Sequence, residues 1–392
     1  MKKEIMRKEI FLDNASTTKV NEKVAEKVKE SMTNFYANAS SLHEPGRKAK
    51  NLLEESRKKI ANFIGAESSE IVFTSGGTES NNLTLRGLAK ANPDKKHIIT
   101  SVIEHPSILE TCEDLKRDGY KIDYIKVDGE GIVDIKELEK KIRNDTLVVS
   151  IMHVNNEIGT IQPIEEIGKI CKKKKVYFHT DAVQSFKKID IDVKKMNIDL
   201  MSVSAHKIHA PKGVGFLYVK KRVKILPIIT GGGQEKNLRS GTENLPGIIG
   251  LASAIEIRID KEEIKKMRNK IMEEILKIPG SKINGSKEKR IYNNINISFY
   301  GIEGEGLMLN LEQDGIFVST GSACASNKLE ESHVLRSIKV DEMYIHGSIR
   351  ITLDEISEGE CNFVSEKIRE AVSKLRKISP FKLNLREMPY EK

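Results

Sequence analysis

The sequence predicts an α/β fold, in which helices cover a mainly parallel β-sheet, followed by a smaller α+β region. Short runs rich in β-branched residues alternate with longer amphipathic, charged stretches over the first two-thirds of the chain. This alternation is typical of βαβ units around a parallel sheet. It ends near residue 250, where a long helical pattern begins and a less regular section follows.

The expected elements follow one another in strand and helix pairs. The stretch 70–77 reads as a strand before a helix over 78–91, and 96–105 reads as a strand before a helix over 106–119. Apolar runs bounded by polar turns predict four further strands, within 146–156, 176–185, 198–207 and 214–221. Ligands bind beyond the carboxyl ends of the strands in such sheets, so polar residues at these ends are where chemistry is expected.

Residues 247–278 predict one long helix, continuous or broken, and mark the change of character in the chain. We therefore expect a large domain over 15–255. Residues 1–14 and 256–392 are expected to form the small domain, which carries a mobile cysteine-bearing loop.

Composition argues against several classes of protein. The 66 Lys and Arg residues exceed the 57 Asp and Glu residues by nine, but both signs are interleaved, so no nucleic-acid-binding stripe is expected. The four cysteines are far apart with no CxxC spacing, which argues against a zinc site or a disulfide framework and favours the cytoplasm. No apolar segment follows the basic N-terminus, and no run reaches the ~18 residues of a membrane span.

Two of the expected strand ends carry groups suited to an anion and a cation. Gly76, Gly77 and Thr78 follow a strand and precede a helix, and such a turn can hold a phosphate, although a capped helix explains it equally well. Asp181 follows an apolar strand, with Gln184 three residues on. A carboxylate there either caps the next helix or pairs with a cationic ring nitrogen, as in pyridoxal phosphate enzymes.

Two further strand ends complete the set. Lys207 ends a strand, with Ser204 and His206 close by in the sequence. Its amine could form a Schiff base, and the alternative is an ordinary surface lysine in a hairpin. His105 ends a strand before Pro106 and falls on the same edge of the expected sheet. Together the four ends supply a phosphate cradle, a ring-nitrogen acid, a Schiff-base lysine and a stacking ring, which is the composition of a pyridoxal phosphate site.

One cysteine stands in an unusual setting. The segment "VSTGSACASN" surrounds Cys324 with the smallest residues available, instead of the branched neighbours of a packed strand. This composition indicates a thiol on a segment that moves.

With these motifs in place, the chain resembles a cysteine desulfurase of the NifS/IscS type, within the class V aminotransferase-like, fold-type I pyridoxal phosphate enzymes. The resemblance runs nearly end to end, through "FLDNASTTKV", "TSGGTESNN", "IEHPSIL", "IMHVNNEIGTIQPI", "HTDAVQS", "SAHKIHAPKGVG", "GGGQEKNLRSGTEN", "STGSACAS" and "SIRITL". It implies a mainly parallel seven-stranded sheet in the large domain. The lysine motif alone would identify only the superfamily, and "GSACAS" before "SIRITL" narrows it to the desulfurases.

The resemblance also implies roles for individual residues. Lys207 would carry the cofactor and move protons, Asp181 would keep the ring nitrogen protonated, and His105 would stack on the ring and assist proton transfer. Gln184 and Asn156 would bond the phenolic oxygen of the ring. The residues implied to hold the phosphate are Gly77, Thr78, Ser204 and His206, joined by Thr242 from a second subunit.

The implied substrate is L-cysteine, and the implied products are L-alanine and a persulfide on Cys324. Arg350 would bind the substrate carboxylate bidentately, with Asn38 assisting. The family expectation is a homodimer that passes sulfur to an iron–sulfur scaffold protein of the NifU/IscU kind or to another acceptor. A selenocysteine lyase or a class V aminotransferase of the same fold is the alternative.

Overall fold

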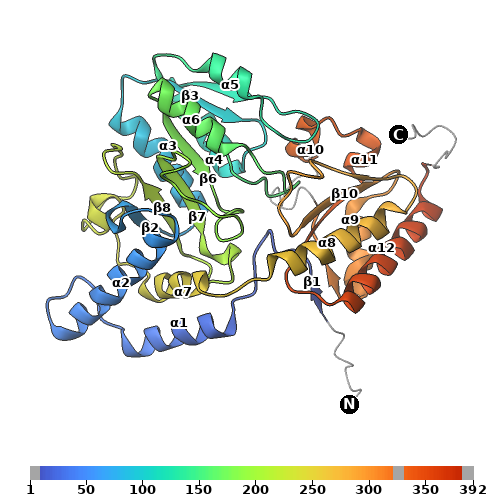
Figure 1. Ribbon diagram of the computed structural model, residues 1–392, viewed down its shortest axis with the longest axis horizontal. Coiled ribbons are helices and arrows are strands. Elements are labelled where there is room, and N and C mark those ends of the chain that lie inside the picture. Colours follow the sequence, from blue (N-terminus) through green and yellow to red (C-terminus); the bar gives the residue numbers. More distant parts are fainter. Residues whose placement is uncertain (1–8, 321–330, 382–392) are drawn as a thin grey trace.

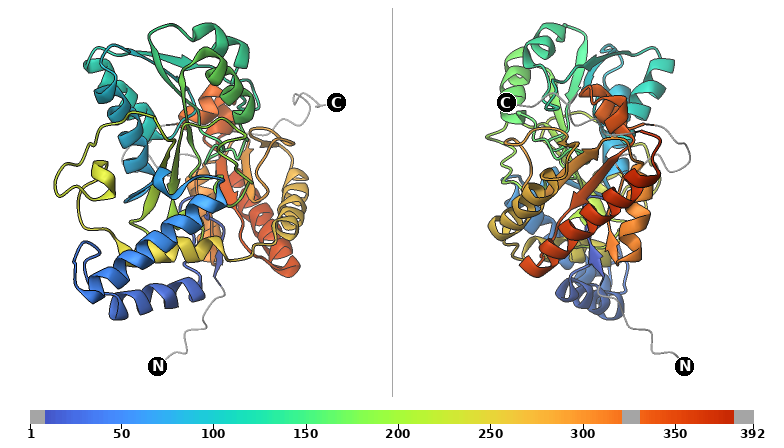
Figure 2. Two further views of the ribbon diagram at one scale, coloured as in Figure 1. Left: turned by 60° about the vertical axis from the view of Figure 1, so that its left-hand side comes forward. Right: turned by 90° about the vertical axis from the view of Figure 1, so that its right-hand side faces the viewer.

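A computed structural model describes residues 9–320 and 331–381 of the chain. Figure 1 shows a larger part built on one sheet and a smaller part on the right of the view. Figure 2 shows from two further sides that the smaller part packs against one flank of the larger one.

The larger part contains a seven-stranded sheet, as the family resemblance implies, whereas the residue patterns predict six of its strands. Strand β8 is antiparallel to both of its neighbours, and the remaining pairs are parallel. In spatial order the strands are β2 (Ile71–Thr74), β8 (Gly215–Val219), β7 (Leu200–Ser204), β6 (Tyr177–Asp181), β5 (Thr146–Ser150), β3 (His97–Ser101) and β4 (Lys121–Ile125). The predicted α/β fold with a mainly parallel sheet is confirmed.

Helices cover both faces of this sheet because its side chains alternate between two hydrophobic clusters. Phe73 and Phe216 belong to one cluster, whereas their neighbours Val72 and Leu217 belong to the other. The first face is covered by α1 (Glu22–Asn34), α2 (Glu44–Phe63), α5 (Ile135–Lys141), α6 (Ile164–Lys174) and α7 (Leu245–Ile255). The second face is covered by α3 (Gly77–Ala91) and α4 (Pro106–Arg117).

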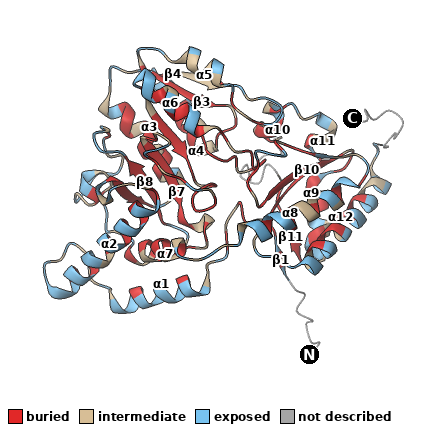
Figure 3. Ribbon diagram, in the orientation of Figure 1, coloured by how far each residue is buried: buried red, intermediate tan, exposed pale blue. Residues whose placement is uncertain are grey.

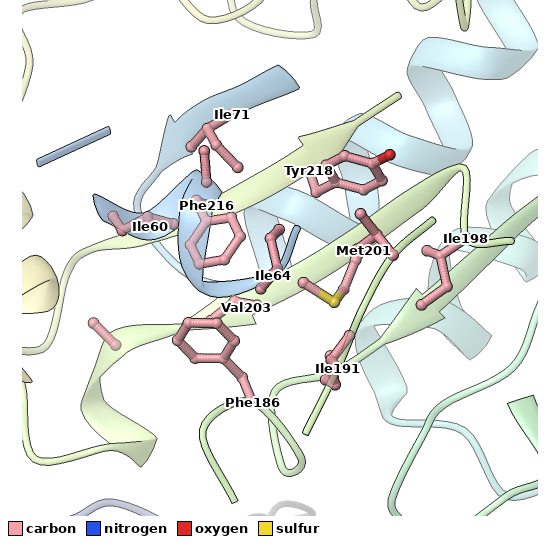
Figure 4. Close-up of a cluster of buried hydrophobic side chains, with 14 of the residues drawn as sticks. Ile60, Ile64, Ile71, Phe186, Ile191, Ile198, Met201, Val203, Phe216 and Tyr218 are labelled. Carbon is pink, nitrogen blue, oxygen red and sulfur yellow. The ribbon is translucent and has the colours of Figure 1, made fainter. Parts of the chain in front are cut away.

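Figure 4 shows part of the first cluster, in which Phe186 packs beside Phe216 and Val203. The rings of Phe186 and Phe216 meet edge to face with centroids 5.3 Å apart. Phe186 therefore anchors the segment that follows β6 in the core on the first face of the sheet.

The smaller part has its own sheet and core. Helices α8, α9 and α12 pack on a three-stranded antiparallel sheet, with buried apolar faces and exposed outer faces (Figure 3). The elements are β9 (Ser281–Ile283), β10 (Asn294–Phe299), β12 (Ser348–Thr352), α8 (Lys261–Leu276), α9 (Gly304–Gln313), α10 (His333–Ser337), α11 (Glu342–Ile345) and α12 (Glu358–Ile378). A parallel pair joins β1 (Ile10–Phe11) to β11 (Ile316–Phe317).

The predicted helix over 247–278 is broken. Helix α7 ends at Ile255, and α8 begins at Lys261 with Asp260 as its N-cap. The three largest cores on either side of this break share no residue, and Ile10 and Leu12 pack with that of the smaller part, whereas a fourth, small cluster joins the two parts through Ile103, Ile158, Val334 and Leu335. This separation supports our proposed division into 15–255 and 1–14 with 256–392. None of the described helices is long and apolar enough to cross a membrane.

Candidate active site

A cavity of about 420 Å³ lies at the carboxyl ends of the strands in the large sheet. It is lined by ten of the residues that the sequence nominates, which come from both parts of the chain. These residues are Gly77, Thr78, His105, Asn156, Asp181, Gln184, Ser204, His206, Lys207 and Arg350.

Three nominated residues are not among those that line the cavity. Asn38 is exposed between α1 and α2, and its side-chain oxygen accepts hydrogen bonds from Ser40 N (2.9 Å) and Ser40 Oγ (2.7 Å). Thr242 is exposed in the loop before α7. Cys324 lies outside the described residues.

Lys207 enters the cavity from a short 3-10 turn over Ala205–Lys207, directly after β7. The sequence prediction that Lys207 itself ends the strand is therefore wrong by three residues, because the chain turns at Ser204 to begin the hairpin into β8. The Lys207 Nζ donates hydrogen bonds to the carbonyl oxygens of Ala15 and Ser16, both at 2.6 Å. The amine is thus held at the cavity wall by backbone groups.

Asp181 is the last residue of β6, and both of its carboxylate oxygens accept hydrogen bonds. Oδ1 accepts from Val183 N at 2.9 Å, and Oδ2 accepts from Asn81 Nδ2 at 2.8 Å. Asn81 also donates to Ser107 Oγ at 2.8 Å. These bonds fix the buried carboxylate, and an ionised carboxylate has lone pairs left for a further donor in the cavity.

His105 is the N-cap of α4, four residues beyond the end of β3, so the prediction that it ends a strand is wrong. Its Nδ1 accepts a hydrogen bond from Ser107 N at 3.1 Å, which replaces the missing partner of a helix-start amide. Burial lowers the pKa of His105 despite the opposing charge of Asp181, and Lys207 lowers it further. The ring is therefore neutral at neutral pH, with its proton on Nε2.

The candidate phosphate cradle lies at the N-terminus of α3, where the first backbone amides have no partners within the helix. Gly76 has a φ of 153°, and a methyl group at Gly77 would lie only 2.6 Å from Val183 Cγ2. Only glycine allows this close approach. Nearby, burial and the charge of Lys207 lower the pKa of His206 to about 4, so this imidazole is neutral.

Arg350 lies on β12 and is 2% exposed. Its Nη2 pairs with Asp13 Oδ1 at 2.7 Å, and its Nη1 donates to Asn156 O at 3.1 Å. Its buried Nε has no hydrogen-bond partner among the described residues. A guanidinium in this position offers an oriented positive charge to an anionic group in the cavity.

Several residues of the site were missed by the sequence reasoning. Asn81 and Ser107 orient Asp181 and His105, and the carbonyls of Ala15 and Ser16 hold Lys207. Asn81 lies one helical turn beyond Thr78, so helical spacing from the glycine turn was a usable signal for it. The roles of the Ala15 and Ser16 carbonyls could not be predicted, because no pattern of side chains in the sequence indicates which backbone carbonyls accept hydrogen bonds.

The family model for class-V aminotransferases matches residues 10–354 of the chain. A curated relative from Dictyoglomus turgidum, named cysteine desulfurase IscS, is 48% identical over 385 residues, which are 96% of this chain and 98% of the relative. A solved structure titled NifS-like protein has a TM-score of 0.89 at 40% identity, covering 94% of this chain and all of its own. A second, titled SspA in complex with cysteine, has a TM-score of 0.81 at 37% identity and covers 88% of this chain and 99% of its own.

Proposed function

The chain belongs to the class-V aminotransferase family and, within it, to the cysteine desulfurases, and from this premise we propose how its site works. The site takes L-cysteine with pyridoxal phosphate as cofactor, and delivers sulfur to Cys324. The observation that carries this proposal is that Lys207 and Asp181 line one cavity with a glycine cradle. The similarities do not favour the selenocysteine lyase or aminotransferase alternative.

The residues present fit pyridoxal phosphate. Glycine at 77 leaves room where a methyl group would collide with Val183, Gly76 has a φ of 153° that side chains rarely adopt, and the N-terminus of α3 favours an anion. Asp181 suits a protonated ring nitrogen, and Lys207 supplies an amine. A cavity of about 420 Å³ also lies in the range of small-molecule sites. We assign the phosphate to Gly77, Thr78, Ser204 and His206.

When bound, this cofactor supplies an aldehyde for Schiff-base formation and a ring that stabilises a carbanion. Asp181, fixed by Asn81 and Val183, holds a proton on the ring nitrogen. Lys207 gives up the bonds to Ala15 and Ser16, and then moves the proton at the α-carbon of the substrate. Neutral His105 would stack on the ring and assist proton transfer, while Gln184 and Asn156 would donate hydrogen bonds to the phenolic oxygen of the ring.

Arg350, which lines the cavity, binds the carboxylate of cysteine; the expected help of Asn38 is not part of this proposal, because its side chain is exposed outside the cavity. Cys324 then forms an S–S bond with the substrate sulfur as the C–S bond breaks, so that cysteine and a protein thiol give alanine and a protein persulfide. The other three cysteines, Cys112, Cys171 and Cys361, are buried, and burial raises their pKa values to about 12, 12 and 11. A buried thiol with a raised pKa is a poor nucleophile, which favours Cys324.

We further propose a cytoplasmic homodimer in which Thr242 reaches the phosphate of the partner subunit. The exposure of Thr242, away from the cavity of its own chain, supports this assignment. The sulfur acceptor is an iron–sulfur scaffold protein of the NifU/IscU kind or another sulfur carrier.

The cofactor assignment is tested by adding pyridoxal phosphate, reducing with borohydride and locating the adduct by mass spectrometry. Wild-type protein should develop a visible band and carry the adduct on Lys207. Lys207→Ala should lose both, whereas Lys212→Ala should keep both, because Lys212 lines the same cavity without a proposed role. A wild-type protein without an adduct, or an adduct that survives in Lys207→Ala, would refute the assignment.

A further inference from the structure

Two successive lysines, Lys187 and Lys188, are buried near the site, and each is only 7% exposed. They follow Phe186, which anchors this segment in the core of the large sheet (Figure 4). Turn bonds from Phe186 N to Ala182 O (2.8 Å) and from Lys188 N to Ser185 O (2.9 Å) make the segment compact. A buried ammonium is costly without partners, so each lysine requires an explanation.

The partners of the two amines differ. Lys187 Nζ donates to Ala254 O at 2.5 Å and so ties the segment to α7, which is a structural role. Lys188 Nζ donates to Gln184 Oε1 at 3.3 Å, and this is its one hydrogen bond to the described residues. Lys188 is therefore connected to a residue that lines the cavity, whereas Lys187 is not.

The bond from Lys188 determines how Gln184 presents its amide. Lys188 Nζ donates to Oε1, and Nε2 is left to donate to Ala15 O at 2.8 Å, a carbonyl that can only accept. One N–H of Nε2 remains for a ligand in the cavity. Ala15 O also accepts from Lys207 Nζ at 2.6 Å, so the Gln184 amide and the Lys207 amine share one acceptor.

The charges around Lys188 also connect it to the site. Burial, together with the charges of Lys207 and Arg350, lowers the pKa of its amine to about 7 against the opposing charge of Asp354. An anionic group in the cavity would add a favourable charge to this set and so favour the protonated amine.

We propose that Lys188 is a positioning residue, which holds the Gln184 amide so that its free N–H points to the anionic ring oxygen of the cofactor. This inference rests on the proposed pyridoxal phosphate site. The amide must keep its orientation when Lys207 leaves Ala15 O to bond the cofactor. The hydrogen bond from Lys188 to Gln184 Oε1, beside the one from Gln184 Nε2 to Ala15 O, prevents the amide from turning.

The test compares Lys188→Met with Lys187→Met, because both remove a buried amine from the same segment. For each purified protein, the dissociation constant of pyridoxal phosphate and the pH midpoint of its visible band are measured. Lys188→Met should bind the cofactor about tenfold more weakly and shift the midpoint. Lys187→Met should leave the dissociation constant and the pH midpoint at their wild-type values. If either variant melts at a lower temperature than the wild type, it should be Lys187→Met.

Gln184→Leu provides an independent measurement, which stands even where Lys188→Met fails to fold. It should weaken binding and shift the band as Lys188→Met does, and combining the two changes should add nothing. Wild-type binding in Gln184→Leu, unchanged binding in Lys188→Met, equal effects of both methionine variants, or additive effects would each overturn the inference. A wild-type protein that develops no band would instead contradict the proposed cofactor.

Discussion

Arg57 and Glu235 form a buried ion pair that offers the sharpest test of the fold beside the site. Their side chains are 3% and 2% exposed, and two bonds of 2.7 and 2.8 Å join the guanidinium to the carboxylate. Glu235 also accepts from Phe73 N at 2.7 Å, on the strand that leads into the glycine cradle. Glu235, Lys236 and Asn237 all have positive φ, so the pair holds a strained segment in place.

Arg57→Met should destabilise the protein strongly, because it leaves the Glu235 carboxylate buried without its cation. Removing one partner of a buried pair costs about 3–5 kcal/mol. With an unfolding entropy of about 2.1 cal/mol/K per residue, a chain of 392 residues shifts by about 1.2 °C per kcal/mol, so the melting temperature should fall by about 4–6 °C. The measurement is thermal unfolding followed by circular dichroism, with cofactor-saturated protein throughout.

The matched control is Arg143→Met, which removes a similar two-bond pair with Asp145 at 3.0 and 3.1 Å on the surface. Exposed pairs contribute less than about 1 kcal/mol, so this variant should melt close to wild type. Arg57→Met with Glu235→Met should recover part of the loss, since no unpaired charge remains. Equal melting temperatures for Arg57→Met and Arg143→Met would refute the reasoning.

Two further predictions concern one buried group behind the cavity wall and one glycine that lines the cavity. Burial raises the pKa of Glu104 to about 8, opposed by the bonds from Ser101 and Met152 N, so the folded state binds its proton more tightly than the unfolded state. The stability that the protonated Glu104 contributes is therefore fully present below about pH 4.3 and is lost as the pH rises through 8. Glu104→Gln should consequently lower the melting temperature less at about pH 8 than at about pH 5. An identical difference at both pH values would contradict this. Gly77→Ala places a methyl group 2.6 Å from Val183 Cγ2. It should weaken cofactor binding by about tenfold or more by equilibrium titration, whereas Gly359→Ala, in open space, should not. Equal affinities in these two variants would argue against the cradle.

Strong local patterns made the fold class predictable. The buried strands β5 and β7 lie within the predicted stretches, because continuous apolar runs bounded by turns allow few other structures. Strand β4 was missed because it lies at the sheet edge and most of its residues are partly exposed, so its sequence carries no apolar run. The pairing of Ile10 with Ile316 was also beyond local patterns, since it joins segments far apart in the chain.

The position of the cavity was predictable where a polar side chain stands at a strand end, as Asp181 does. His105 shows the limit of such reasoning, since Pro106 begins a helix and the histidine caps it instead of ending the strand. Lys188 was missed because lysine in the run "KKID" reads as a solvated surface. Its burial depends on Phe186 packing into the sheet core, which only tertiary structure reveals.

The most direct test of the proposed chemistry is the turnover of L-cysteine, with alanine and protein-bound persulfide measured together. Wild-type protein should form one alanine for each sulfur transferred, with the persulfide located on Cys324 by mass spectrometry. Cys324→Ser should keep the visible cofactor band and form no persulfide. A keto acid in place of alanine, or wild-type persulfide in Cys324→Ser, would contradict the account.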